Sequence, residues 1–189
     1  MAETMNIEKL SKCGKLTEFA PNEIICIENQ PGETAYLLLK GNAKVKVGSF
    51  KDNAKDVAII PAGAIFGEMS LLEGNPRSAT VTSGDEPTTV LEIGKDDFLA
   101  LMKTEPELAY NMLRTMYTRI EDSLTKHRGY LVAYAAEVRH EPMYVQISKL
   151  TLQQFTDIVK QDDKHALRLL KYMSHILTVI DDKVREIGG

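Results

Sequence analysis

The chain has 189 residues, of which 43% are hydrophobic and 26% charged, so it can bury a core and is not disordered throughout. Its formal net charge of −4 argues against general nucleic-acid binding. No apolar run approaches 20 residues and the first residues lack a signal-peptide pattern, which excludes a membrane span and predicts a cytoplasmic protein. The only cysteines, Cys13 and Cys26, suit a reducing compartment, and the four histidines show no metal-ligand spacing, so we expect no metal.

The first half of the chain is predicted to be mainly β-structure. Apolar residues at helical spacing predict one short helix over residues 6–16. Short segments rich in β-branched residues then alternate with Pro, Gly and Asn turns. The expected strands are Glu23–Ile27, Ala35–Leu39, Ala43–Val47, Val57–Ile60, Ala79–Thr82 and Thr88–Ile93. This spacing is typical of a barrel or a jelly-roll-like sandwich.

Helical periodicity begins again after residue 94. A short helix is expected over residues 96–102, with Asp96 or Asp97 as its cap, followed by a long helix from Pro106 to Val138. Apolar residues from Leu113 to Val138 recur in steps of four and three, a heptad pattern. The pattern predicts a homodimer through this helix; the alternative is a long helix packed within one chain.

The C-terminal part resembles the segment before it. A second heptad pattern runs from Ala166 to Ile187, and a shift of 57 residues places Phe98 on Phe155. We therefore interpret residues 143–187 as a partial repeat of strand, short helix and long helix, with Tyr144–Ile147 as the strand. The alternative is that amphipathic helices resemble one another by chance.

Residues 66–81 carry the groups suited to a phosphorylated sugar. Gly67 permits a positive φ or close backbone approach, and the turn that follows has free N–H groups. Arg77 offers a planar fork of donors for phosphate oxygens, and Ser78 adds a hydroxyl. Glu68 is an acceptor suited to a ribose hydroxyl. A GxxxxGK[ST] loop is absent, so hydrolysis of ATP or GTP is not indicated.

This stretch resembles the phosphate-binding cassette of cyclic-nucleotide-binding domains, a family that includes the catabolite activator protein and the regulatory subunit of cyclic-AMP-dependent protein kinase. The resemblance covers about residues 7–128, and includes Gly32, Gly41 and Gly63. It implies a double-stranded β-helix, or β-roll, followed by the long heptad helix and a C-terminal helical extension. It assigns residues 1–128 to the binding domain with the start of the long helix, and 129–189 to dimerisation or output.

The resemblance also implies roles for individual residues. Glu68 would accept the ribose 2′-hydroxyl, and Arg77 would pair with the cyclic phosphate. The remaining cradle would comprise Gly67, Met69, Ser78 and Ala79. Serine at position 78 favours cyclic AMP over cyclic GMP in this family. The candidates for contact with the base are Val57 and Ile59 on a strand and Ser123 and Thr125 on the long helix.

The sequence therefore predicts a cyclic-nucleotide sensor that has no enzymatic activity and acts on an unidentified protein partner. A dimeric scaffold with a vestigial or repurposed pocket is the second hypothesis. A transcription regulator is the third: residues 150–171 can be written as two helices and a turn, but Asp162 and Asp163 open the second helix, so we do not expect DNA binding.

Overall fold

The computed structural model describes residues 13–48, 55–162 and 164–187. The chain divides into two compact units, residues 1–99 and 100–189. The first unit holds all the strands of the described residues, and the second is helical. The boundary between these units therefore falls before the long helix. The sequence-based boundary at residue 128 would instead group the start of that helix with the strands.

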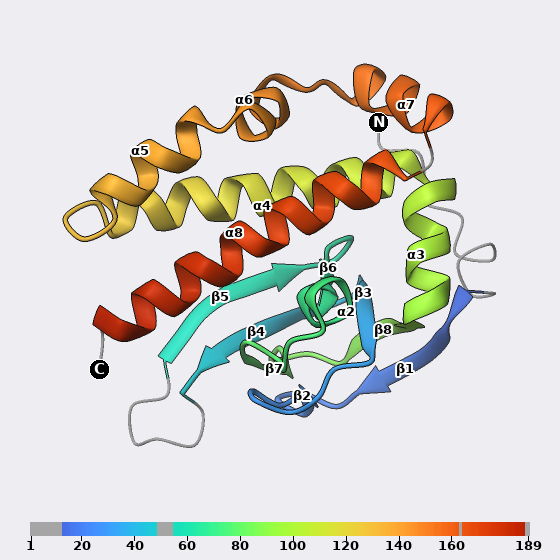
Figure 1. Ribbon diagram of the computed structural model, residues 1–189. Coiled ribbons are helices and arrows are strands. Elements are labelled where there is room, and N and C mark those ends of the chain that lie inside the picture. The colour runs from blue at the N-terminus through green and yellow to red at the C-terminus, as the bar shows by residue number, and fades with distance from the viewer. Residues whose placement is uncertain (1–12, 49–54, 163, 188–189) are drawn as a thin grey trace. The chain divides into compact units, whose positions relative to one another are not determined.

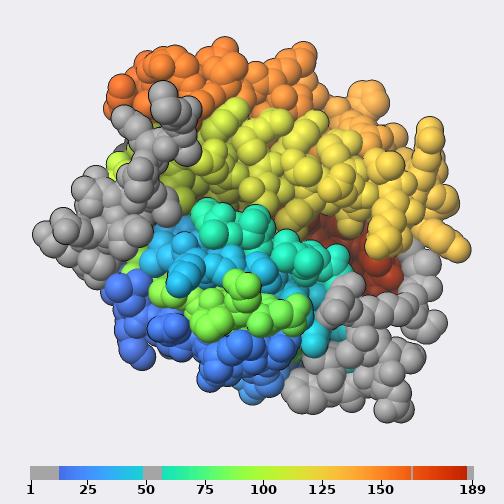
Figure 2. Space-filling model, turned by 180° about the vertical axis from the view of Figure 1, so that it is seen from behind, coloured from blue at the N-terminus to red at the C-terminus, as the bar shows by residue number. Residues whose placement is uncertain are grey.

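The first unit is a β-roll made of two antiparallel four-stranded sheets (Figure 1). One sheet has the order β1-β8-β3-β6, and the other has the order β2-β7-β4-β5. Segments far apart in the sequence are thereby neighbours, as the blue and green surfaces in Figure 2 show. The strands are β1 (Lys15–Phe19), β2 (Ile24–Cys26), β3 (Thr34–Lys40), β4 (Asn42–Val47), β5 (Lys55–Pro61), β6 (Ile65–Phe66), β7 (Thr80–Ser83) and β8 (Thr88–Gly94).

The core of the β-roll lies between the two sheets. Successive side chains of a strand point to opposite faces of its sheet, and those that point inward form this core. The central buried cluster comprises Tyr36, Leu38, Ala43, Phe66, Val81 and Val90. The mainly β fold and all six predicted strands are confirmed.

Two strands were not predicted, and one predicted helix is partly wrong. Leu16, expected at the end of the first helix, lies in β1, which pairs with β8. Residues 6–12 of that helix lie outside the described residues. The second missed strand, β6, has two residues, too few for a periodic pattern.

Helix α3 (Lys95–Thr104) follows β8 directly and crosses the division between the units. Asp96 and Asp97 lie in its first turn, so the prediction that one of them caps the helix is wrong. At this position the carboxylates still complement the positive end of the helix dipole.

Beyond the end of α3, the described residues of the second unit form five helices. They are α4 (Pro106–Lys126), α5 (Val132–His140), α6 (Pro142–Lys149), α7 (Leu152–Gln161) and α8 (His165–Ile187). The two longest, α4 and α8, pack along one another (Figure 1). The predicted C-terminal helix is confirmed.

The single helix predicted from Pro106 to Val138 is wrong. Helix α4 ends at Lys126, and a turn around Gly129 separates it from α5. Glycine costs about 1 kcal/mol in a helix relative to alanine, and here the backbone N–H groups of Tyr130 and Leu131 both donate to the His127 carbonyl. The heptad pattern therefore does not form one continuous surface. Its α4 part lies on a helix that packs against α8 within the chain, and a homodimer through this helix stays a prediction.

The strand predicted over Tyr144–Ile147 is also wrong, because these residues lie in α6. Pro142 occupies the first turn of that helix, where its missing N–H costs nothing. The two buried residues, Tyr144 and Ile147, are three apart, which is a helical spacing. The proposed repeat is thus limited to a short helix followed by a long one, with Phe98 and Phe155 both fully buried.

Side-chain contacts tie α5 and α6 to α4. The Glu121 carboxylate accepts hydrogen bonds from the Arg139 guanidinium (2.6 Å) and the Tyr144 hydroxyl (2.7 Å). The Arg139 hydrogen bond is the main reason that the pKa of Glu121 is lowered. The rings of Tyr117 and Tyr144 lie 5.2 Å apart, between centroids. These contacts hold α4, α5 and α6 together as one packed group.

Candidate ligand-binding site

The 66–81 stretch folds as a tight turn, one short helix and a return to the sheet. Gly67 precedes helix α2 (Glu68–Glu73) with φ +73°, and Gly74 ends it with φ +76°. Both angles lie in the left-handed region, where a side chain costs about 1 kcal/mol or more. A Cβ on Gly67 would also lie 2.6 Å from Arg77 Nη1. The glycine is required because the arginine packs directly against its backbone.

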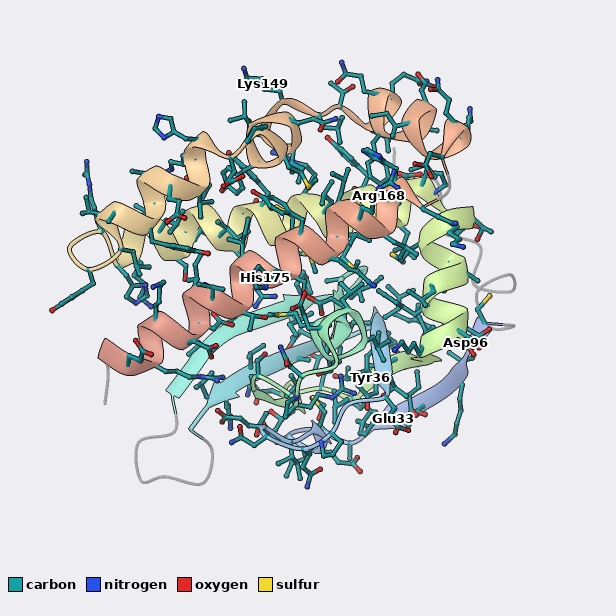
Figure 3. All side chains as sticks on the ribbon, viewed as in Figure 1. Glu33, Tyr36, Asp96, Lys149, Arg168 and His175 are labelled. Atoms are coloured by element: carbon teal, nitrogen blue, oxygen red, sulfur yellow. The ribbon has the colours of Figure 1, made fainter. Side chains whose placement is uncertain are left out.

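Arg77 is buried, with only 6% of its surface exposed. Its Nη1 donates to the Gly67 carbonyl at 2.7 Å. Its Nη2 donates to the Thr34 carbonyl at 2.7 Å and the Thr34 hydroxyl at 3.1 Å. The guanidinium carbon lies 5.5 Å from the centre of the Tyr36 ring, which is labelled in Figure 3.

The electrostatics of this arrangement favour an anion. In the part of the chain that the structure describes, the hydrogen-bond acceptors of Arg77 are neutral oxygens and its further partner is a ring face. A guanidinium has five N–H donors, and three oxygens occupy three of them. A desolvated cation without a paired carboxylate is costly, and an anion on its remaining donors would lower that cost.

Two residues of the predicted cassette, Gly67 and Arg77, are brought together by the fold. Glu68 is buried, with 4% exposure, and Met69, Ser78 and Ala79 are half-buried. Gly67 and Arg77, ten residues apart, are in direct contact. The roles of these residues in binding a ligand stay predictions.

The predicted base-contact residues lie on β5 and α4, outside the 66–81 stretch. Val57 and Ile59 on β5 are 54% and 69% exposed. Ile60, which alternates with Ile59, packs on the core cluster, so Ile59 faces away from it. Ser123 and Thr125 lie near the end of α4, in the second unit. Contact of these four residues with a base stays a prediction.

Comparison with known proteins identifies a domain family for the β-roll region. Residues 16–105 match the family "Cyclic nucleotide-binding domain". A cGMP-dependent protein kinase of Eimeria tenella is 38% identical over 78 residues, 41% of this chain and 7% of the kinase. The Cyclic AMP receptor protein of Thermus thermophilus is 28% identical over 92 residues, 49% of this chain and 42% of that protein. The β-roll unit belongs to the cyclic nucleotide-binding domain family.

A solved structure supports the same fold. A transcriptional regulator from Thermotoga maritima aligns with a TM-score of 0.56 and 25% identity, over 68% of this chain and 98% of the regulator. The chain spans less than half the length of the two curated relatives above. Within the described residues, no helix is long and apolar enough to cross a membrane.

The structure adds contacts of Arg77 that sequence analysis missed. Thr34 supplies two of its three oxygen acceptors, from 43 residues away. Gly32 was one of the glycines in the family resemblance, and Tyr36 lay in a predicted strand. No sequence motif, however, places either residue beside Arg77. Pairing of β3 with β6, which sets Tyr36 opposite Phe66, places this segment beside Gly67. Such pairing is not visible in local spacing.

Cys26 lies close enough to Arg77 for the charge to act on its thiol. Burial raises the pKa of Cys26, and the Arg77 charge offsets part of that rise. We expect Cys26, in a Cys13→Ser background, to react with Ellman's reagent at pH 8 more slowly than glutathione, because the thiolate is the nucleophile. Raising the pH should accelerate the reaction. A rate equal to that of glutathione would contradict the burial described here.

Proposed function

We propose that this chain is a cyclic-nucleotide sensor whose ligand is cyclic AMP. The buried Arg77 guanidinium, held by neutral oxygens, is the observation that carries the proposal. Arg77 would pair with the cyclic phosphate and Glu68 would accept the ribose 2′-hydroxyl. The Gly67 and Met69 backbone and Ser78 would complete the cradle, with Ala79 beside them. Serine at position 78 supports cyclic AMP over cyclic GMP, by the family tendency given above.

We propose further that the output is a rearrangement of helices rather than catalysis. Helix α3 joins β8 to the helical unit without an intervening loop, so movement at the sheet can reach α4 through the backbone. A ligand that binds one arrangement more tightly than another shifts the population toward it. The helical unit would then present the signal to a protein partner in a reducing cytoplasm.

Homodimerisation becomes an outcome to measure, since Leu113, Ile120 and Leu124 of the predicted seam are already buried within the single chain. Small-angle scattering with and without cyclic AMP would report both oligomeric state and rearrangement. An unchanged profile would count against the switch but not against binding.

Isothermal titration calorimetry tests the binding proposal directly. We expect saturable heat with cyclic AMP and weaker binding of cyclic GMP. Tighter binding of cyclic GMP would overturn the ligand assignment alone. No heat from either nucleotide, with no shift of the thermal unfolding midpoint, would overturn the sensor and favour the scaffold hypothesis.

A further inference from the structure

The groups that hold Arg77 come largely from one short segment at the start of β3. We call Gly32, Thr34 and Tyr36 the arginine cradle. Thr34 offers two oxygens to Nη2, and Tyr36 offers its ring face at 5.5 Å from the guanidinium carbon. Gly32 lies so close that an added Cβ would be 2.6 Å from both Cζ and Nε of Arg77. The guanidinium is therefore enclosed by a segment far from Arg77 in sequence.

Two members of the arginine cradle, Tyr36 and Thr34, are themselves held in place by the sheet. Tyr36 is 8% exposed, and its ring stacks on Phe66 with centroids 5.0 Å apart and planes inclined by 18°. Thr34 pairs with Gly94 in β8, which sets the direction of its carbonyl. The ring and the carbonyl thus belong to the packed sheet, as a well-supported binding group requires.

The Thr34 hydroxyl is the part of the arginine cradle that a single substitution can remove. The Thr34 and Gly67 carbonyls belong to the backbone and stay in any variant that folds. Loss of the hydroxyl leaves Nη2 with one described acceptor instead of two. Because a guanidinium is planar, a small rotation redirects its remaining donors together.

We infer that Thr34 is a positioning residue for Arg77: its hydroxyl sets the direction in which the guanidinium presents its remaining N–H donors to a bound phosphate. This inference rests on the proposed function, since it concerns the same arginine. Thr34 acts through Arg77 and is not assigned a contact with the ligand. A change in the orientation of the guanidinium alters how tightly it binds each of the two exocyclic phosphate oxygens.

The test compares Thr34→Val with Thr34→Ser in the full chain. Valine keeps the β-branched shape that suits a strand but has no hydroxyl, whereas serine keeps the hydroxyl. Titration calorimetry would measure affinities for cyclic AMP and for its two phosphorothioate diastereomers, Sp and Rp. In these analogues sulfur replaces one exocyclic oxygen or the other.

We expect Thr34→Val to bind cyclic AMP about tenfold more weakly, as loss of one hydrogen bond to a charged group implies. The ratio of Sp to Rp affinity should change severalfold, and Thr34→Ser should restore both values. A merely structural role would lower the unfolding temperature without moving the ratio, and an unchanged ratio overturns the inference. If the wild-type chain binds neither nucleotide, the proposed function fails; if it binds and Thr34→Val matches it, only this inference fails.

Discussion

Replacing Arg77 with alanine is expected to weaken cyclic AMP binding by about 2–5 kcal/mol, the usual cost of truncating one partner of a buried charge pair. The side chain is 6% exposed, so water cannot replace it easily at the phosphate. The variant also loses the only cation that the structure shows bonded to Gly67 within the described residues. Calorimetry on the variant and the wild-type chain would give the difference directly.

Two further variants separate charge from geometry. Arg77→Lys keeps the positive charge but replaces a planar fork with a single ammonium, so we expect an intermediate loss. Arg185→Ala removes the same charge from an exposed position on α8, and affinity should stay within about twofold, since exposed charges interact weakly through solvent. If Arg77→Ala also stayed within that range, the phosphate would have to bind elsewhere.

Local sequence patterns predicted most strands because each is a short segment, rich in β-branched and apolar residues, that turn residues bound. They missed β1, whose polar sequence Lys-Leu-Thr-Glu-Phe is held in the sheet by pairing with β8. Tertiary pairing, rather than propensity, makes this segment a strand. The same limit explains why Thr34 was missed as a contact of Arg77.

For the helices, sequence patterns led to the opposite error. A regular apolar spacing predicted one continuous helix where the structure has two, α4 and α5. The heptad spacing continues across residues 127–131, but the backbone turns there, at Gly129. Leu131 and Val138 are buried all the same, because α5 folds back to pack in the helical unit. Apolar spacing indicates which residues are buried, but it does not distinguish one long helix from two shorter ones.

Replacing Phe155 with alanine is expected to destabilise the helical unit by about 3–5 kcal/mol, the usual cost of removing a buried phenylalanine ring. Phe155 is fully buried in α7, and its ring centroid lies 5.7 Å from that of Tyr110 on α4. The Tyr110 hydroxyl donates to the Leu150 carbonyl at 2.9 Å, just before α7. The cavity would therefore loosen the contact that holds α7 against α4.

Leu152→Ala is the matched control, because Leu152 lies on the same helix but is 37% exposed. Its cost should be about 1 kcal/mol or less, since most of the lost surface was partly hydrated already. Urea unfolding followed by far-ultraviolet circular dichroism would measure both variants. Equal losses would contradict the packing described for α7. A selective loss in Phe155→Ala that leaves cyclic AMP affinity unchanged would locate the binding determinants in the β-roll unit, whereas reduced affinity would support the predicted base contacts at Ser123 and Thr125.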